Sequence, residues 1–211
     1  MQLFFASGAS SMAPHILLRE LHLDFELQRV NLDQKTWVKG DYNKVNPKSY
    51  VPALELDDGE RLTECAVILE YLGAQAGQLI APYGSDEYWQ QRQWLNFIAT
   101  ELHKNFISPF RKGNWLPNTA ESKALVWQRV LPRLRYVEHA FGDGRAWLTG
   151  DKFSIADPYL FVMTNWIRRL DYRFEDLPLL EQFDRCMRKR DTVVETFRVE
   201  GKPHALLDVD N

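Results

Sequence analysis

The sequence predicts an α+β chain of two domains: a small mixed β-sheet covered by helices, followed by an all-helical domain. Two observations support this division. Up to about residue 80, short apolar runs alternate with segments of helical periodicity. Beyond the Pro/Gly segment 81–84, no run shows the alternation of a strand. The predicted boundaries are 1–80 for the first domain and 87–211 for the second.

The first domain has the element order strand, helix, strand, link, strand, strand, helix. A helical crossover between the first two strands makes them parallel neighbours. The turn Asp57-Asp58-Gly59 is typical of a hairpin, so the strands that flank it are predicted to be antiparallel. The predicted strands cover 2–5, 26–31, 53–56 and 61–62, and the predicted helices cover 12–21 and 66–74.

The second domain is predicted to contain helices only. Pro132 lies inside one of them and is expected to bend it, because an internal proline removes a backbone hydrogen bond and costs ~3 kcal/mol. Ser154 and Asp157 have the spacing of a capping box, in which Ser154 accepts from the Asp157 amide and the carboxylate reaches back. The segment 201–211 shows little periodicity. The predicted helices cover 86–106, 121–141, 159–170 and 179–188.

Composition excludes several functional classes. A net charge of −3 does not provide the basic surface that nucleic-acid binding requires. No apolar run reaches the ~20 residues of a membrane-spanning helix. The chain starts without the cationic segment of a secretory signal, and Cys65 and Cys186 form no disulfide framework. We therefore expect a reduced, cytoplasmic enzyme without nucleic-acid or membrane partners.

Several common catalytic motifs are absent. The sequence contains no P-loop, no Gly-x-Gly-x-x-Gly, no Gly-x-Ser-x-Gly, no His-Glu-x-x-His and no Cys-x-x-Cys. The histidines have no metal-ligand spacing, so neither a nucleotide enzyme nor a metal site is predicted. These histidines are His15, His22, His103, His139 and His204.

The segment after the first strand contains two adjacent serines, Ser10 and Ser11. It lies at a strand-to-helix transition, where the helix dipole and unpaired N–H groups favour an anion. A thiolate would be stabilised there, and a serine hydroxyl would donate a hydrogen bond to it. The alternative is that a serine only caps the helix, as serines commonly do. The spacing alone does not decide between these two interpretations, nor between Ser10 and Ser11 as the residue concerned.

Two further segments have the character of a peptide-binding site. Pro52, just before a strand, marks a turn or an edge strand. X–Pro bonds are mostly trans, but a cis Val51–Pro52 bond would turn the Val51 N–H and C=O outward to pair with a ligand as a strand does. Glu64 and Cys65 begin a helix, where free N–H groups suit a carboxylate and Glu64 suits an ammonium. An ordinary helix start is the alternative for this pair.

In the helical domain, one stripe of the first long helix carries polar side chains. Asn96, Thr100 and His103 are spaced i, i+4 and i+7, which places them on one face. Lys104 next to His103 adds positive potential for an anionic ligand. The alternative, which is equally well supported, is that these three side chains form hydrogen bonds between helices of the bundle.

Together these segments resemble the glutathione S-transferase family, and specifically its bacterial beta class. The resemblance extends over nearly the whole chain. The Val-Pro and Ser-Ile-Ala-Asp motifs are typical of the superfamily, and the Glu-Leu-His-Lys segment is more specific to the beta class. The matching segments are 8–11, 14–15, 46–47, 50–54, 62–64, 94–96, 100–104 and 154–161.

The resemblance implies a thioredoxin-like domain followed by an all-α domain, assembled as a homodimer. It also implies glutathione as the co-substrate. In the site it implies a cis Pro52, a Val51 backbone that pairs with the cysteinyl unit, and a γ-glutamyl end held by Glu64 and Cys65. Thr100 and Glu101 would lie where the dimer partner's helix comes close. The other implied glutathione-binding residues are Lys35, Asn96 and His103.

The chain departs from the beta class at Ser10, where these enzymes typically carry a cysteine that can form a mixed disulfide with glutathione. Serine cannot do this, but its hydroxyl can hydrogen-bond the glutathione thiolate, as the serine of other transferase classes does. Lowering a thiol pKa from about 8.5 to between about 6 and 7 would make most of it reactive at neutral pH. Cys65 replaces the small Gly or Ser usual after the acid, and is a candidate for oxidation by glutathione disulfide.

The expected activity is conjugation of the glutathione thiolate to hydrophobic electrophiles in detoxification, with Ser10 and His103 as catalytic residues. Two alternatives stay open: a glutathione-dependent disulfide reductase or peroxidase that uses Cys65, and a non-catalytic protein that binds glutathione or hydrophobic ligands. The acceptor pocket is expected between the domains. Its candidate wall residues are Phe106, Phe110, Trp115 and Trp166.

Overall fold

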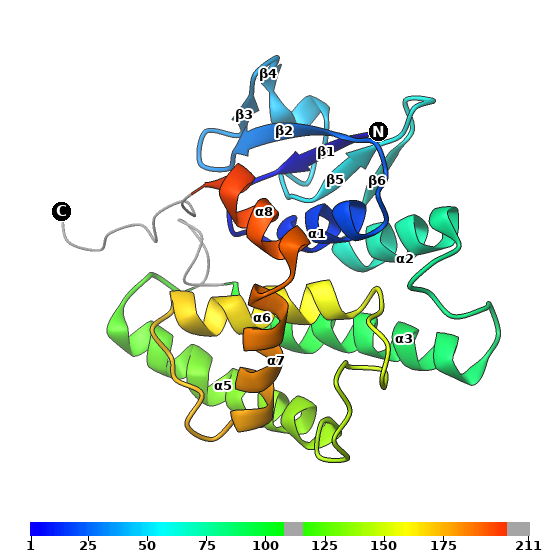
Figure 1. The fold of residues 1–211 in the computed structure, drawn as a ribbon. Helices are drawn as coiled ribbons and strands as arrows, with labels where there is room; N and C mark the ends of the chain where they lie inside the picture. The colour runs from blue at the N-terminus through cyan, green and yellow to red at the C-terminus, as the bar shows by residue number, and fades with distance from the viewer. Residues whose placement is uncertain (108–115, 202–211) are drawn as a thin grey trace.

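The computed structural model describes residues 1–107 and 116–201, and Figure 1 shows a sheet domain above a helical domain. The strands are β1 (Gln2–Phe5), β2 (Glu26–Asn31), β3 (Thr36–Trp37), β4 (Gly40–Asp41), β5 (Ala53–Glu55) and β6 (Arg61–Thr63). They form one sheet in the order β4-β3-β2-β1-β5-β6. β1 and β2 are parallel, and all other neighbours are antiparallel. The predicted mixed sheet is confirmed.

The hairpin of β3 and β4 was not predicted. Each of its strands has only two residues, so the sequence has no alternation to indicate it. β3 pairs with β2 through Val30 and Trp37, and it extends the sheet on the side away from β5. The predicted hairpin around Asp57-Asp58-Gly59 is confirmed, with Ala53 opposite Thr63.

Alternation along β1 divides the core of the first domain. Leu3 faces α1 (Met12–Glu20) and α2 (Cys65–Ala76), which lie between the sheet and the helical domain in Figure 1. Phe4 faces the other way and packs against Trp37 and Tyr42, the latter in the short helix η1 (Tyr42–Lys44). The loop from the end of β1 to α1 therefore lies next to the helical domain, where α1 contacts α6 (Asp157–Arg169).

The helical domain differs in two places from the prediction. The single helix expected over 86–106 is interrupted by π-helical turns in its middle, and a helix at 191–200 was not predicted. That last helix depends on its packing against α1, which no local pattern indicates. The elements are α3 (Asp86–Phe97), η2 (Ile98–His103), α4 (Lys104–Phe106), α5 (Ala120–Ala140), α6 (Asp157–Arg169), α7 (Pro178–Arg188) and α8 (Asp191–Glu200).

Two further features bear on the predictions for this domain. α5 continues through Pro132 as one helix over its whole length. α8 packs against α1, so the end of the described chain returns to the sheet domain (Figure 1). Among the helices of the described residues, none combines the length and the apolar character needed to cross a membrane.

The capping box before α6 is present in a modified form. The Asp157 carboxylate accepts from the Ser154 amide (2.7 Å) and the Ser154 hydroxyl (3.0 Å), as expected, and also from the Leu148 amide (2.8 Å). The expected reciprocal bond from the Asp157 amide to the Ser154 hydroxyl is wrong. That hydroxyl accepts from Ala156 N (3.3 Å), because α6 begins only at Asp157.

Asp157 also predicts a pH dependence of stability. Burial raises the pKa of its carboxyl to about 6, above the ordinary value of about 3.9. The folded protein then binds more protons than the unfolded chain between these values, so this group's contribution to stability is lost as the pH rises from about 4 to about 6. Relative to Asp157→Asn, the wild type should lose about 2 to 3 kcal/mol over that range in urea denaturation. A difference independent of pH would contradict this.

Candidate functional site

The loop between β1 and α1 gives its two serines different partners. Ser11 Oγ accepts from the Ala6 amide (3.2 Å) and donates to the Ala6 carbonyl (3.3 Å). Its side chain is fully buried, and both of its hydrogen-bonding functions are used within the loop. Ser11 therefore closes the loop on itself.

Ser10 joins the loop to a second segment. Its hydroxyl donates to the Val51 carbonyl (3.2 Å), across the corner that precedes β5. The Val51–Pro52 peptide bond is cis, as the resemblance implied. Tyr42 Oη and Asn46 Nδ2 both donate to the Tyr50 carbonyl at 2.8 Å. These two hydrogen bonds fix the backbone just before the cis bond. The structure thus brings Ser10 and Val51 together.

Glu64 and Cys65 begin α2 beside the same corner. The Glu64 backbone has a φ of 69°, in the left-handed region, and its exposed carboxylate accepts from Lys48 Nζ (2.6 Å). The same ammonium donates to Thr63 Oγ1 (2.7 Å). Glu64 is therefore an accessible anion at the edge of the corner.

Cys65 lies close to Ser10 but is packed away from solvent. Its Sγ donates weakly to the Ser10 carbonyl (3.5 Å), and the side chain is buried. Burial raises the pKa of the Cys65 thiol well above its ordinary value. A protonated, covered thiol is a poor nucleophile.

His103 approaches from the helical domain at the end of the π-helical turns. Its Nδ1 shares a hydrogen bond with the Tyr159 hydroxyl (2.6 Å), and its ring lies edge-on to Trp166, with centroids 5.1 Å apart. Burial raises the pKa of Tyr159 well above its ordinary value, so this hydroxyl stays protonated. When Tyr159 donates to Nδ1, the ring proton lies on Nε2.

Within the described residues, the other predicted site residues make no hydrogen bond with Ser10 or Val51. Asn96 and Thr100 are exposed, and Thr100 Oγ1 donates to the Asn96 carbonyl (3.0 Å). Glu101 accepts from Arg133 Nε (2.7 Å) on α5. Lys35 is exposed in the turn after β2. The α-helical spacing that placed Asn96, Thr100 and His103 on one face ends at Phe97, because π-helical turns change which side chains share a face.

Sequence reasoning missed the residues that hold the serine loop from outside. Glu200, only 1% exposed, accepts from Gly8 N (3.0 Å) and His15 Nδ1 (2.9 Å). Arg19 Nε donates to His15 Nε2 (3.0 Å), so Nδ1 is the ring nitrogen that donates to Glu200. Ser7 Oγ donates to the Glu200 carbonyl (2.5 Å). A charged residue near a chain end gives no sequence signal for such burial.

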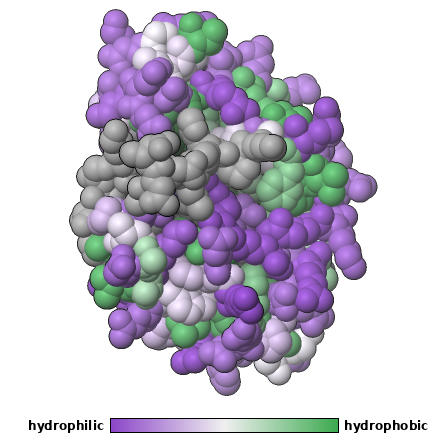
Figure 2. Space-filling model, turned by 90° about the vertical axis from the view of Figure 1, so that its left-hand side faces the viewer, coloured by the Kyte–Doolittle hydropathy of each residue, from purple (hydrophilic) through white to green (hydrophobic). Residues whose placement is uncertain are grey.

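Of the candidate acceptor-pocket residues, two can be located. Phe106 is fully buried and Trp166 nearly so, with ring centroids 6.2 Å apart. Phe110 and Trp115 lie outside the described residues. Figure 2 shows a mostly hydrophilic face on which apolar side chains form small, separate groups.

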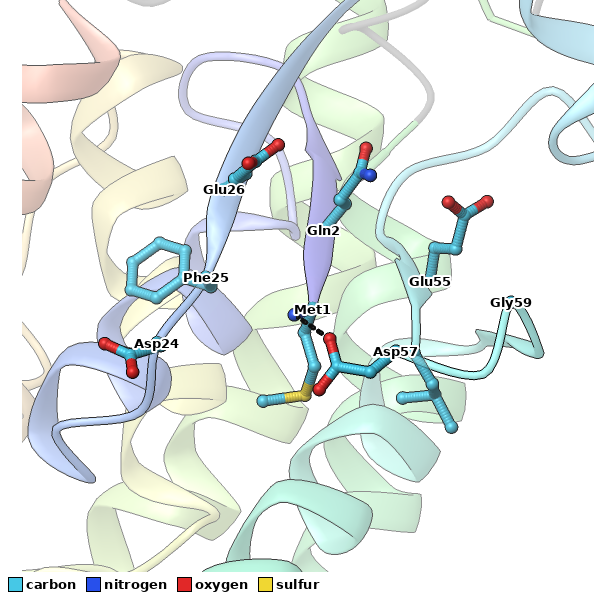
Figure 3. A pocket seen from close by; sticks show the side chains of 9 residues that line it. Met1, Gln2, Asp24, Phe25, Glu26, Glu55, Asp57 and Gly59 are labelled. Carbon is cyan, nitrogen blue, oxygen red and sulfur yellow. Dashed lines mark hydrogen bonds and ion pairs between the residues drawn. The ribbon is translucent and has the colours of Figure 1, made fainter.

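A groove of about 490 Å³ lies elsewhere, at the opposite end of the sheet (Figure 3). Met1 and Gln2 line it where β1 begins, whereas the serine loop follows the end of β1. The Met1 ammonium donates to Asp57 Oδ1 (2.6 Å), and the other acids of the lining are Asp24, Glu26 and Glu55. The acidic side chains and the histidines and cysteines of the described residues form no group of three that could hold a metal ion.

The fold and the corner define a class of protein: a thioredoxin-like sheet with a cis proline before β5, covered by an all-helical domain. Two family models match the chain, glutathione S-transferase N-terminal domain over residues 9–75 and C-terminal domain over residues 114–188. The chain belongs to the glutathione S-transferase family.

Individual relatives agree with this assignment. The chain is 42% identical to glutathione S-transferase GstA of Escherichia coli O157:H7, over 95% of this chain and 99% of the relative. A sphingomonad glutathione S-transferase solved in complex with glutathione is 35% identical, with a TM-score of 0.86 over 95% of this chain and 99% of that one. A bacterial beta class enzyme of Sphingomonas chungbukensis is 34% identical, with a TM-score of 0.87 over 95% and 99%.

Proposed function

We propose that the protein is a glutathione S-transferase that conjugates the thiolate of glutathione to hydrophobic electrophiles. The observation that carries the proposal is the contact of Ser10 Oγ with the Val51 carbonyl. It places a hydroxyl beside the backbone at which a cysteinyl unit would pair as an added strand. The glutathione complex of the sphingomonad relative supports the choice of ligand.

In the proposed complex, the backbone of Val51 pairs with the cysteinyl unit of glutathione. Glu64 receives the γ-glutamyl ammonium, next to Lys48, and the start of α2 at Cys65 faces the γ-glutamyl carboxylate. The remaining contacts come from the other predicted site residues. These are Lys35, Asn96, Thr100, Glu101 and His103.

The proposed chemistry begins with loss of the thiol proton to solvent. Ser10 turns its hydroxyl from the Val51 carbonyl to the sulfur, and a hydrogen bond to an ionised acceptor stabilises the thiolate. His103 adds a second donor from the helical domain. The sulfur then forms a bond to the electrophilic carbon and displaces a leaving group such as chloride.

The two alternative functions are less well supported. A disulfide reductase or peroxidase would need a reactive cysteine, and Cys65 is buried with a raised pKa. A non-catalytic binding protein has no need for the hydroxyl of Ser10 at the corner. Turnover on a panel of electrophiles separates this last alternative from the main proposal.

The proposal also covers the domain boundaries, the oligomeric state and the cellular location of the protein. We place the domain boundaries at 1–80 and 87–211, and propose a cytoplasmic homodimer that acts in detoxification. Large apolar side chains are exposed on three neighbouring helices, as expected of a surface that a second copy covers. They are Val67 on α2, Trp89 on α3 and Tyr136 on α5. The acceptor pocket is proposed to include Phe106, Phe110, Trp115 and Trp166.

Titration calorimetry with glutathione tests the binding claim. The wild type should bind, and Glu64→Gln should bind about tenfold more weakly, because it loses one charge-assisted hydrogen bond to the ammonium. Glu60→Gln, in the exposed turn between β5 and β6, is the matched control and should bind as the wild type does. No heat of binding by the wild type, together with no turnover of a chlorodinitrobenzene-type substrate, would reject the proposal.

A further inference from the structure

The carbonyl group of Gly8 receives two hydrogen bonds from the helical domain. Trp166 Nε1 donates to it at 2.8 Å and Arg169 NH1 at 2.7 Å, both from α6. Gly8 precedes Ser10 by two residues, and its φ of 69° is in the left-handed region. Its amide donates to Glu200 on α8. The backbone N–H and C=O of Gly8 are thus both hydrogen-bonded to helices that are distant in sequence.

The same Trp166 side chain also contacts the second proposed catalytic group. Its ring packs edge-on against His103, at an interplanar angle of 76°. Tyr159, which shares a hydrogen bond with His103, precedes Trp166 by seven residues and so lies on the same face of α6. One face of α6 therefore contacts the serine loop and His103 together.

Both donors to the Gly8 carbonyl are polar groups that are costly to bury. Trp166 is only 3% exposed, so its indole N–H requires an internal partner. Burial lowers the pKa of Arg169 to about 10, so its guanidinium is still charged at neutral pH while partly desolvated. Two such donors on one acceptor restrict the loop more than packing alone would.

We propose that Trp166 is a positioning residue, whose indole N–H holds the Gly8 carbonyl so that Ser10 and His103 act on the same sulfur. The inference rests on the proposed function, since it assumes that these two residues stabilise the glutathione thiolate. It assigns to the N–H group a role distinct from that of the ring as a wall of the acceptor pocket.

The substitution Trp166→Phe separates these roles, because it keeps an aromatic wall and removes the N–H. We expect kcat/KM to fall about 5- to 10-fold for a large electrophile of the chlorodinitrobenzene type and for a small one such as acrylamide alike. The loss of one hydrogen bond has this size. The pH profile of thiolate absorbance for bound glutathione should shift to higher pH. The matched control is Trp127→Phe. Trp127 lies on α5 and stacks on Tyr172, so this change should alter neither the rates nor the pH profile of thiolate formation.

Several results would overturn the inference. One is a Trp166→Phe enzyme whose rates change only with the large electrophile, with thiolate formation unaltered, since this is the signature of a wall. Another is a variant equal to the wild type. Failure of the wild type itself to bind glutathione would instead reject the proposed function.

A second variant covers the case in which Trp166→Phe does not fold. Arg169→Met removes the other donor to the Gly8 carbonyl, and Arg169→Lys restores an ammonium there. The methionine variant should show the same shift in thiolate formation, and the lysine variant should recover most of it. If folded Arg169→Met ionises bound glutathione as the wild type does, the loop is not positioned from α6.

Discussion

Replacing Ser10 by alanine should lower kcat/KM for conjugation at pH 7 by about 10- to 100-fold. A hydrogen bond to an ionised group contributes about 1.5 to 3 kcal/mol, which corresponds to between one and two units of the thiol pKa. Without the Ser10 hydroxyl, a smaller fraction of bound glutathione is thiolate. The loss should therefore diminish as the assay pH is raised toward 9. Steady-state kinetics over pH 6 to 9 measures it.

Ser11→Ala is the matched control one residue away. Its hydroxyl is used by both backbone groups of Ala6, so its loss should destabilise the fold by about 1 to 3 kcal/mol and leave the pH profile of thiolate formation unchanged. Denaturant unfolding and kinetics on the same two variants separate these effects. Normal turnover in Ser10→Ala, with loss in Ser11→Ala, would move the catalytic role to Ser11.

Replacing Glu200 by alanine should destabilise the protein by about 3 to 5 kcal/mol, the largest effect that we expect from a single substitution. The Glu200 carboxylate is nearly inaccessible, and its loss leaves the amide of Gly8 and the Nδ1–H of His15 buried without acceptors. Because Gly8 belongs to the serine loop, the variant should also lose activity before it unfolds. Urea denaturation monitored by tryptophan fluorescence measures the first effect.

Two controls lie on the same helix. Glu195→Ala removes a more exposed carboxylate, paired with Arg198 on the surface, and should change the stability little. Glu200→Gln keeps an acceptor for the Gly8 amide, so its loss should be smaller than that of Glu200→Ala. A destabilisation below about 1 kcal/mol for Glu200→Ala would mean that the loop does not depend on α8.

Local patterns predicted the fold where they are strong. The turn Asp57-Asp58-Gly59 and the short apolar run of β1 located the sheet, because turn chemistry and burial act over a few residues. The hairpin of β3 and β4 and helix α8 escaped prediction, since one is too short for a period and the other depends on its packing against α1. The π-helical turns before His103 likewise have no sequence signature.

The candidate site shows the same limit. Ser10, Val51, Glu64 and Cys65 were singled out from motifs and from the family resemblance, and the structure places them around one corner. The roles of Trp166 and Glu200 toward Gly8 were not foreseen. Their partners lie 158 and 192 residues away in the sequence, where no periodicity relates them.

The sequence by itself determined the family, the two-domain division and the segments that form the corner. The family resemblance singled out Ser10, but only the tertiary structure showed that its surroundings differ from those of Ser11, because adjacent hydroxyls on one loop have the same local chemistry. They differ in their partners: Ser11 bonds to Ala6, five residues away, and Ser10 to Val51, forty-one residues away. A long-range contact of this kind exists only after the sheet has formed, which is why the sequence did not reveal the partners of the two hydroxyls.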